Sequence, residues 1–219
     1  MKSLEQSVAD IFNDHMREKC NGAGTKFHRF SLGGQDRDTG ADYLISNSSS
    51  FALIEFKHSE ADLVSERSKS CREQLCLLLH KNKKMRDIHD RCHFVAWRYS
   101  VSGTLRCAPY RTEICNQLVF PNCASLTRQR PLKSKRLPAD TYCDQFISPP
   151  PVRHAAKVEF EQYLAWLMKD ASGSSQESVE LMARGSVGCT AIRFDSVDAA
   201  YRWMQGIPGF SPKKRTARP

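Results

Sequence analysis

Two acids and a lysine lie at the ends of two neighbouring apolar segments of the chain. Asp42 opens the first segment, and Glu55 and Lys57 close the second. Alternate side chains of a β-strand share one face, so a strand over residues 51–57 projects Glu55 and Lys57 from the same side. These are the residue types that a metal-dependent phosphodiesterase needs, because acids hold a hard cation and an amine stabilises negative charge.

The polar run 47–50 predicts a hairpin between the two segments. A hairpin centred on the middle of that run sets Asp42 directly opposite Glu55, with about 4.5–5.5 Å between their Cβ atoms. A slip of one residue would instead move Asp42 to the far face. Buried carboxylates that face each other repel, and Mg²⁺ or Mn²⁺ relieves that repulsion while keeping positions for a phosphate oxygen and an attacking hydroxide. Lys57 would then stabilise the developing charge or orient the nucleophilic water.

This arrangement resembles the PD-(D/E)xK, or restriction-endonuclease-like, nuclease superfamily. Gly40-Ala41-Asp42 matches the first half of its motif and Glu55-Phe56-Lys57 the second, with Ala41 where many members have proline. The resemblance covers roughly residues 1–120 as an order of elements. It implies that Asp42, Glu55 and the backbone carbonyl of Phe56 bind Mg²⁺ or Mn²⁺ and that Lys57 assists cleavage of DNA, with RNA left open as a substrate. The alternative is an ordinary half-exposed hairpin with a surface Glu-Lys pair.

The resemblance implies two further site residues. Several families of the superfamily supply an acid from the first helix, which makes Glu5 the candidate, and many place a polar residue from the helix after the triplet at the site edge, which Gln74 fits best. Each has an ordinary explanation as well: Glu5 as a first-turn glutamate favoured by the helix dipole, and Gln74 as part of a solvated helix face. Asp36 and Asp38 are rival metal ligands ranked below Asp42, because aspartates in a Gly-rich loop more often form Asx turns.

Hydrophobic spacing predicts the elements that would position these residues. A first helix ends before residue 21, and a strand of mixed polarity covers residues 25–32. A long helix spans roughly residues 60–85, and a buried strand spans residues 93–99. The first helix has its apolar stripe at Leu4, Val8, Ile11, Phe12 and Met16, and the long helix at Cys71, Leu75, Leu78 and Leu79. We therefore predict an α/β fold with a mixed central sheet flanked by helices, in the αβββαβ order of a restriction-endonuclease-like core, with a C-terminal α/β extension.

The chain divides into four predicted parts. Residues 1–120 form the nuclease-like core, and residues 121–152 a basic, proline-rich linker or arm. Residues 153–210 form a C-terminal α/β module or an outer layer of the same domain, with a helix over 158–168, a strand over 187–194 and a helix from Ser196 to Trp203. Residues 211–219 form a basic tail.

The charge of the chain favours a polyanionic partner. Its 219 residues carry a formal net charge of +9, with a pI near 9.2. Candidate phosphate contacts lie near the end of the long helix and in the linker, at Lys81, Lys83, Lys84, Arg86, Arg128, Arg130, Lys133, Lys135 and Arg136. The linker cluster is interpreted either as a phosphate-tracking arm or as a solvated linker that only raises the pI. DNA is the expected partner, and a homodimer or a partner protein in a larger complex is also consistent.

The sequence shows no apolar run long enough to span a bilayer and no signal-peptide pattern. Its nine cysteines include no CxxC pair, which favours a cytoplasmic, reducing location without a disulfide scaffold. Cys107, Cys115, Cys123 and Cys143 could gather around zinc, but buried free thiols explain them better. Two functions remain: a Mg²⁺-dependent nuclease in restriction, repair, recombination or phage defence, or a non-catalytic nucleic-acid-binding protein or assembly subunit on the same fold.

Overall fold

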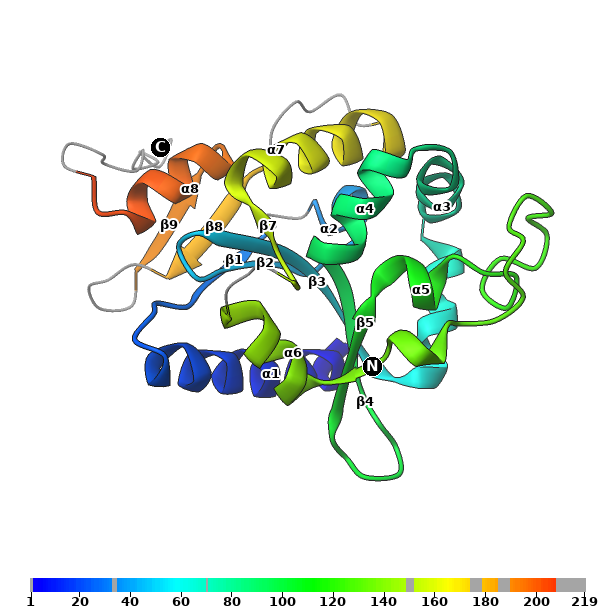
Figure 1. The fold of residues 1–219 in the computed structure, drawn as a ribbon, viewed down its shortest axis with the longest axis horizontal. Coiled ribbons are helices and arrows are strands. Elements are labelled where there is room, and N and C mark those ends of the chain that lie inside the picture. The colour runs from blue at the N-terminus through cyan, green and yellow to red at the C-terminus, as the bar shows by residue number, and fades with distance from the viewer. Residues whose placement is uncertain are drawn as a thin grey trace, which may run out of the picture.

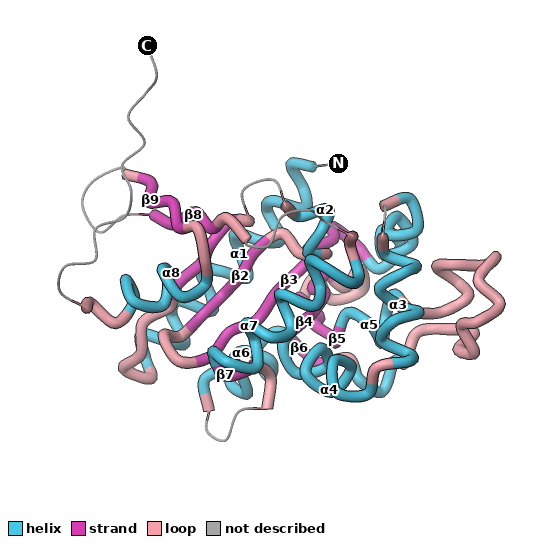
Figure 2. Tube along the Cα trace, turned by 90° about the horizontal axis from the view of Figure 1, so that it is seen from above, coloured by secondary structure: helices cyan, strands magenta, loops and turns pink. Residues whose placement is uncertain are grey.

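The computed structural model describes residues 2–32, 35–69, 71–148, 152–173, 179–184 and 190–207. These residues form an α/β fold around one open, mixed sheet, with helices on both faces (Figures 1 and 2). The predicted basic tail and residues 187–189 of the predicted C-terminal strand lie outside the described residues. None of the described helices is both long and apolar enough to cross a membrane.

The sheet has the strand order β6-β5-β4-β3-β2-β1-β8-β9, and β7 pairs with β3 beside this path. Only β3 and β4 run parallel among the described pairs. The strands are β1 (His28–Ser31), β2 (Tyr43–Ser46), β3 (Ser50–Ser59), β4 (His93–Arg98), β5 (Leu105–Pro109), β6 (Leu137–Pro138), β7 (Ala155–Ala156), β8 (Leu181–Arg184) and β9 (Ala191–Phe194).

The helices cover the two faces of the sheet unequally. On one face, α1 (Lys2–Gly22) and α6 (Ala139–Ile147) pack together; on the other lie α3 (Arg72–Lys81), α4 (Lys83–Cys92), α5 (Tyr110–Ile114), α7 (Lys157–Trp166) and α8 (Val197–Met204) (Figure 1). The other helical segments are α2 (Asp36–Thr39), the 3₁₀ helices η1 (Glu60–Ser68) and η2 (Lys133–Lys135), and the π-helix η3 (Leu167–Ala171).

The alternation predicted for β3 is confirmed. Leu53 packs in the core under α3 and α4, whereas Ala52, Ile54 and Phe56 pack under α1 and α6. Both faces of β3 are therefore covered, which explains why the strand is apolar at nearly every position. Its two polar exceptions, Glu55 and Lys57, are buried and need partners.

The single long helix predicted over residues 60–85 is wrong. The segment is broken into η1, α3 and α4, and α4 continues to Cys92. Cys71 has a left-handed backbone (φ 67°), and the side chain of Asn82 accepts a hydrogen bond from Met85 N, which starts a new helix. Cys71 is consequently half-buried at the start of α3 rather than part of a continuous apolar stripe.

The first helix forms as predicted, but its buried face is rotated relative to the predicted stripe. Val8, Phe12 and Met16 are buried, whereas Leu4 and Ile11 are exposed. The helix also buries three residues on the side away from Ile11, namely Ala9, Asn13 and Cys20.

Residues beyond 120 belong to the same sheet and cores. The predicted linker contains β6 and α6, whose Tyr142, Cys143 and Phe146 pack against α1 and the sheet. The expectation of an extended arm over residues 121–152 is therefore wrong for the part that folds. Strand β8, which the sequence did not predict, joins β1 to β9, so the described C-terminal residues form an outer part of the same sheet.

Candidate active site

The hairpin between β2 and β3 has the predicted register. Tyr43 pairs with Ile54, and Asp42 N also donates to Ile54 O, at 2.9 Å, so the regular ladder ends at Tyr43. Asp42 lies just beyond this last pair, and its side chain is close to Glu55. Its Oδ2 accepts a hydrogen bond of 2.7 Å from Phe56 N, and this contact holds the carboxylate against β3.

The pairing of two acids changes the ionisation of Asp42. Burial and the negative charge of Glu55 raise the pKa of Asp42 to about 7, against the smaller opposing effect of Phe56 N and the nearby lysines. Asp42 therefore titrates near neutral pH, and a positive charge beside it would favour its ionised form.

Glu55 and Lys57 form an ion pair in the interior. Their side chains are 1% and 3% exposed, and Lys57 Nζ donates to Glu55 Oε1 at 2.6 Å. Burial alone would lower the pKa of Lys57, but the carboxylates of Glu55 and Glu66 raise it well above its usual range. The lysine is therefore held as an ammonium that can stabilise negative charge.

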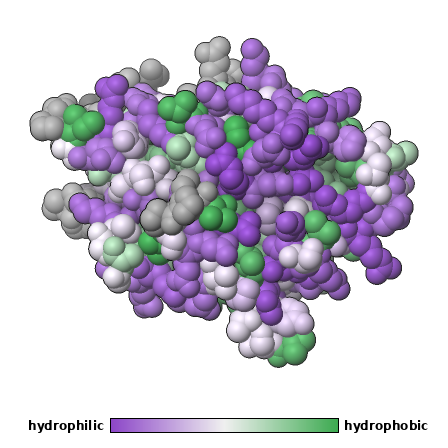
Figure 3. All heavy atoms as spheres, in the orientation of Figure 1, coloured by the Kyte–Doolittle hydropathy of each residue, from purple (hydrophilic) through white to green (hydrophobic). Residues whose placement is uncertain are grey.

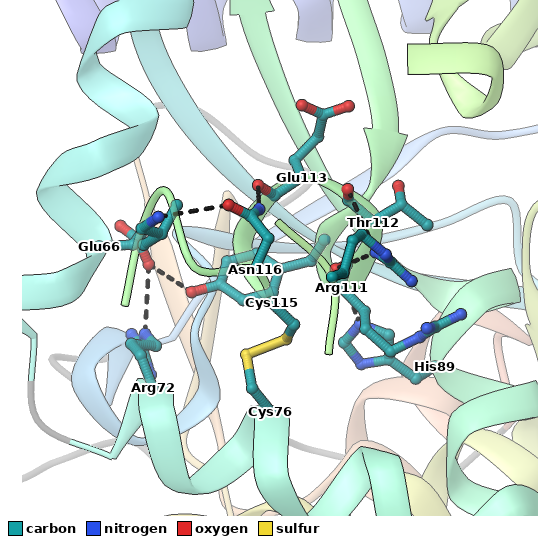
Figure 4. The surroundings of a disulfide bond; sticks show 12 residues. Glu66, Arg72, Cys76, His89, Arg111, Thr112, Glu113, Cys115 and Asn116 are labelled. Atoms are coloured by element: carbon teal, nitrogen blue, oxygen red, sulfur yellow. Dashed lines mark hydrogen bonds and ion pairs between the residues drawn. A yellow bond between two sulfur atoms is a disulfide. The ribbon is translucent and has the colours of Figure 1, made fainter. Parts of the chain in front are cut away.

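A third buried carboxylate, Glu66, was not predicted. It lies in η1 and is fully buried; its Oε1 lies 2.9 Å from Lys57 Nζ and 2.8 Å from Lys69 Nζ. Its Oε2 accepts hydrogen bonds from Arg72 Nε at 3.3 Å and from the Tyr110 hydroxyl (Figure 4). Burial would raise the pKa of Glu66, but its cationic neighbours lower it far below its usual range, so it stays ionised.

The residues that sequence reasoning missed carry a recognisable spacing. Glu66, Lys69 and Arg72 follow at intervals of three, which places charged side chains on one side of a helical turn. By itself, that spacing is typical of a solvated helix face. Only the burial of Glu66 and Arg72 and the contact of Lys69 with Glu55 identify them as part of the site.

The structure brings Glu5 to this site and leaves Gln74 away from it. Glu5 Oε1, in the first turn of α1, lies 4.0 Å from Lys57 Nζ. Gln74 is exposed on α3 and is not among the residues that line the cleft, so its placement at the site edge is wrong. The break at Cys71 turns α3 so that Arg72 faces Glu66 instead. Asp38 is half-buried in α2 and does not line the cleft, and the side chain of Asp36 lies outside the described residues.

The site opens into a cleft of about 670 Å³. Its floor is formed by the two strands of the hairpin, and its sides by α1, η1 and the β1–β8 edge. The lining residues are Glu5, Gln6, Ala9, Ser31, Leu32, Asp42, Tyr43, Glu55, Phe56, Lys57, Ser65, Lys69 and Met182. All the acids proposed for catalysis therefore reach one solvent-accessible space.

One carboxylate oxygen of Glu55 is not paired by either lysine, and a divalent cation would fit there. Glu55 Oε2 is buried and has no hydrogen-bond partner within the described part of the chain. Such an oxygen is costly unless a donor or a cation meets it. Among the described residues, no three His, Cys, Asp or Glu side chains converge as a metal site. A cation would accordingly rest on Asp42, Glu55, a backbone oxygen such as that of Phe56, and water.

Two of the predicted phosphate-binding residues are tied into the fold. Arg136 is paired with the buried Glu113 and with Glu60, and Arg128 donates to the backbone oxygens of Arg111 and Thr112. The prediction that these two belong to a free arm is wrong, because their guanidinium groups already satisfy buried or partly buried acceptors.

The other predicted phosphate contacts are more accessible. Arg86 is half-buried and donates to His80 O, and Lys84 donates to Gln162 while remaining exposed. The remaining five are exposed on the surface: Lys81, Lys83, Arg130, Lys133 and Lys135. None of the nine lines the cleft. Figure 3 shows a largely hydrophilic face with scattered hydrophobic side chains.

A buried hydrogen-bond chain supports the turn that carries Asp42. Arg111 N donates to His89 Nε2 at 3.1 Å, and Tyr163 Oη lies 2.7 Å from His89 Nδ1 and 2.8 Å from His93 Nδ1. His93 Nε2 lies 2.9 Å from Gly40 O, which can only accept. Burial lowers the pKa of both histidines, so one tautomer set satisfies every member: His89 donates to Tyr163, Tyr163 to His93, and His93 to Gly40.

The cysteines depart from the expected free thiols at one point. Cys76 and Cys115 form a disulfide that links α3 to the end of α5 (Figure 4). The described cysteines outside this bond are free, and Cys107, Cys123 and Cys143 are buried. Cys115 is thus neither a free thiol nor available to zinc.

Comparison with known proteins adds no assignment. No protein-family model matches the chain, and no curated protein or solved structure is significantly similar to it.

Proposed function

We propose that the chain is a Mg²⁺-dependent nuclease that hydrolyses phosphodiester bonds in DNA, on a restriction-endonuclease-like core. One observation carries the proposal: Asp42 and Glu55 lie close together at the end of the β2–β3 hairpin, and Glu55 Oε2 is buried without a partner among the described residues, beside the lysine pair. The net charge of +9 favours a polyanionic substrate.

The roles of the residues follow from their contacts. A divalent cation at this position would supply a Lewis acid and would lower the pKa of its bound water. Asp42 and Glu55 would hold the cation, and Phe56 N fixes the Asp42 carboxylate in place. Lys57, fixed between Glu55 and Glu66, stabilises the negative charge that develops on the phosphate. Glu5, at the cleft wall 4.0 Å from Lys57 Nζ, is placed to orient a water.

A second candidate function has its own supporting observation. Lys57 and Lys69 both contact Glu55 Oε1, so two ammonium groups neutralise this carboxylate without any metal. A chain with such a self-satisfied site could bind nucleic acid without cleaving it, alone or as a subunit of a larger assembly. The two functions differ in whether a divalent cation has any effect on the substrate.

The deciding experiment is cleavage of linear, circular, branched and single-stranded DNA, and of RNA, with Mg²⁺ or with EDTA. We expect Mg²⁺-dependent cleavage by the wild type and a loss of turnover by orders of magnitude in Lys57→Ala, with little change in DNA affinity. Lys57→Arg should also be impaired, because a planar guanidinium does not replace a compact ammonium in a closed site. Lys169→Ala, at an exposed lysine in η3, is the matched control.

Calorimetry supplies a second readout that does not depend on cleavage. Asp42→Ala and Glu55→Ala should each weaken Mn²⁺ binding strongly while leaving the fold intact. Unchanged Mn²⁺ binding in both variants would refute the metal site. Metal-independent DNA binding without cleavage of any substrate would favour the second function.

A further inference from the structure

Lys69 lies at the mouth of the cleft. It directly follows η1, and its side chain is 29% exposed, against 3% for Lys57. Its Nζ contacts Glu55 Oε1 and lies 2.8 Å from Glu66 Oε1. Lys57 Nζ contacts the same two oxygens, at 2.6 and 2.9 Å. Two ammonium groups thus share two carboxylate oxygens.

Glu66 does not need Lys69 for its own neutrality. Its Oε1 is already met by Lys57, and its Oε2 by Arg72 and the Tyr110 hydroxyl. These contacts come from β3, α3 and α5, so the Glu66 carboxylate is fixed from three elements. Lys69 is therefore an additional cation on a rigid anionic support.

A divalent cation bound to Glu55 would repel the two lysines, because two ammonium groups and a metal ion would then surround one carboxylate. Lys57 is on β3 in the middle of the sheet, and its side chain is only 3% exposed. Lys69 is outside the sheet and partly exposed, and a lysine has a flexible four-carbon stem with rotatable donors. Of the two lysines, Lys69 is therefore the one that can move away from Glu55. Its contact with Glu66 then keeps its ammonium group at the cleft.

We propose that Lys69 is a second phosphate-binding cation of the site: it neutralises Glu55 in the metal-free protein, and with a divalent cation on Glu55 it binds a non-bridging oxygen of the scissile phosphate. Glu66 is then a positioning residue that holds Lys69 and Lys57 but does not bind the metal. The proposal rests on the proposed nuclease function for its second half. Its first half, competition between Lys69 and the metal, does not depend on cleavage.

The test uses Lys69→Met, which keeps the length of the side chain and removes its charge, and Lys69→Gln, which also keeps a hydrogen-bonding group. Lys169→Met, at an exposed lysine in η3, is the matched control. Mn²⁺ binding is measured by calorimetry without DNA, and binding of a duplex oligonucleotide is measured with Ca²⁺ replacing Mg²⁺. Single-turnover cleavage is measured with Mg²⁺.

We expect both Lys69 variants to bind Mn²⁺ about five-fold or more tightly than the wild type, because a competing ammonium has been removed. Both should bind the duplex about ten-fold more weakly in Ca²⁺ and cleave more slowly, while Lys169→Met changes neither the Mn²⁺ affinity nor the duplex affinity. Unchanged or weaker Mn²⁺ binding overturns the competition. Tighter Mn²⁺ binding with unchanged duplex affinity and cleavage overturns the phosphate contact.

The same data separate this proposal from the proposed function. A wild type that binds Mn²⁺ but cleaves nothing refutes the nuclease, and the Mn²⁺ affinities of the Lys69 variants still decide the competition. If Lys69→Met does not fold, Lys69→Gln provides the same readings, since it keeps a polar contact to Glu66.

Discussion

Replacing Asp42 by asparagine should stabilise the metal-free protein at neutral and alkaline pH. Burial and the charge of Glu55 raise the pKa of Asp42 from 3.8 to about 7. That difference corresponds to at most about 4 kcal/mol in the free energy of unfolding. Asp42 is half-buried, so solvent screening reduces the expected gain to about 2 kcal/mol.

The sign follows from proton binding. Between about pH 4 and pH 7 the folded protein keeps the proton on Asp42 while the unfolded chain has released it, so the stability of the wild type falls as the pH rises through this window. Asparagine keeps the acceptor for Phe56 N but has no proton to release. The advantage of Asp42→Asn should therefore be small near pH 4 and reach its full value above pH 7.

The assay is thermal unfolding in EDTA at several pH values between about 4 and 8.5, a range that spans the titration of Asp42. For a chain of this length, about 2 kcal/mol corresponds to a rise in Tm of about 4–8 °C at pH 8. Asp87→Asn, at an exposed aspartate on α4, is the matched control and should show no pH-dependent gain. A Tm difference that does not grow with pH, or a destabilised Asp42→Asn at pH 8, would show that the two carboxylates do not repel as their positions require.

Three other features lead to measurable expectations. Gly40→Ala should lose more stability in urea than Gly24→Ala: both glycines have positive φ, but an added Cβ at Gly40 lies 3.3 Å from neighbouring side chains, whereas at Gly24 it meets none within 4 Å. The difference should be about 1–2 kcal/mol, and equal losses would mean that the crowding is relieved freely. Replacing both Cys76 and Cys115 by alanine should cost about 4 kcal/mol in denaturant unfolding, since the bond closes a loop with a sequence separation of 39; an equal loss of stability for the wild type in dithiothreitol would confirm the cause. The exposed basic residues of the predicted linker are Arg130, Lys133 and Lys135. Neutralising them should reduce the slope of log DNA affinity against log salt concentration by about 0.9 for each phosphate that is no longer bound. An unchanged slope would place the DNA elsewhere.

The hairpin and its two acids could be predicted from the sequence alone. Alternation along residues 51–57 is a local property, and a short polar turn leaves few registers, so the pairing of residues 43–46 with 51–54, which brings Asp42 near Glu55, follows before any tertiary contact is known. The buried strand β4 and the capped helix α8 were predictable for the same reason, because their hydrophobic pattern and capping residue are local.

The rest of the site depends on tertiary contacts. Glu66 and Lys69 look like ordinary surface charges in the sequence, and they become part of the site because η1 follows β3 directly and folds back beside Lys57. Tyr110 reaches Glu66 from 44 residues further along the chain. Arg136 likewise looks like part of a basic arm, and it is a buried charge only because Glu113 lies beside it in the fold. The physical reason is the same in each case: whether a charged side chain is solvated or buried depends on neighbours distant in sequence, and local periodicity carries no information about them.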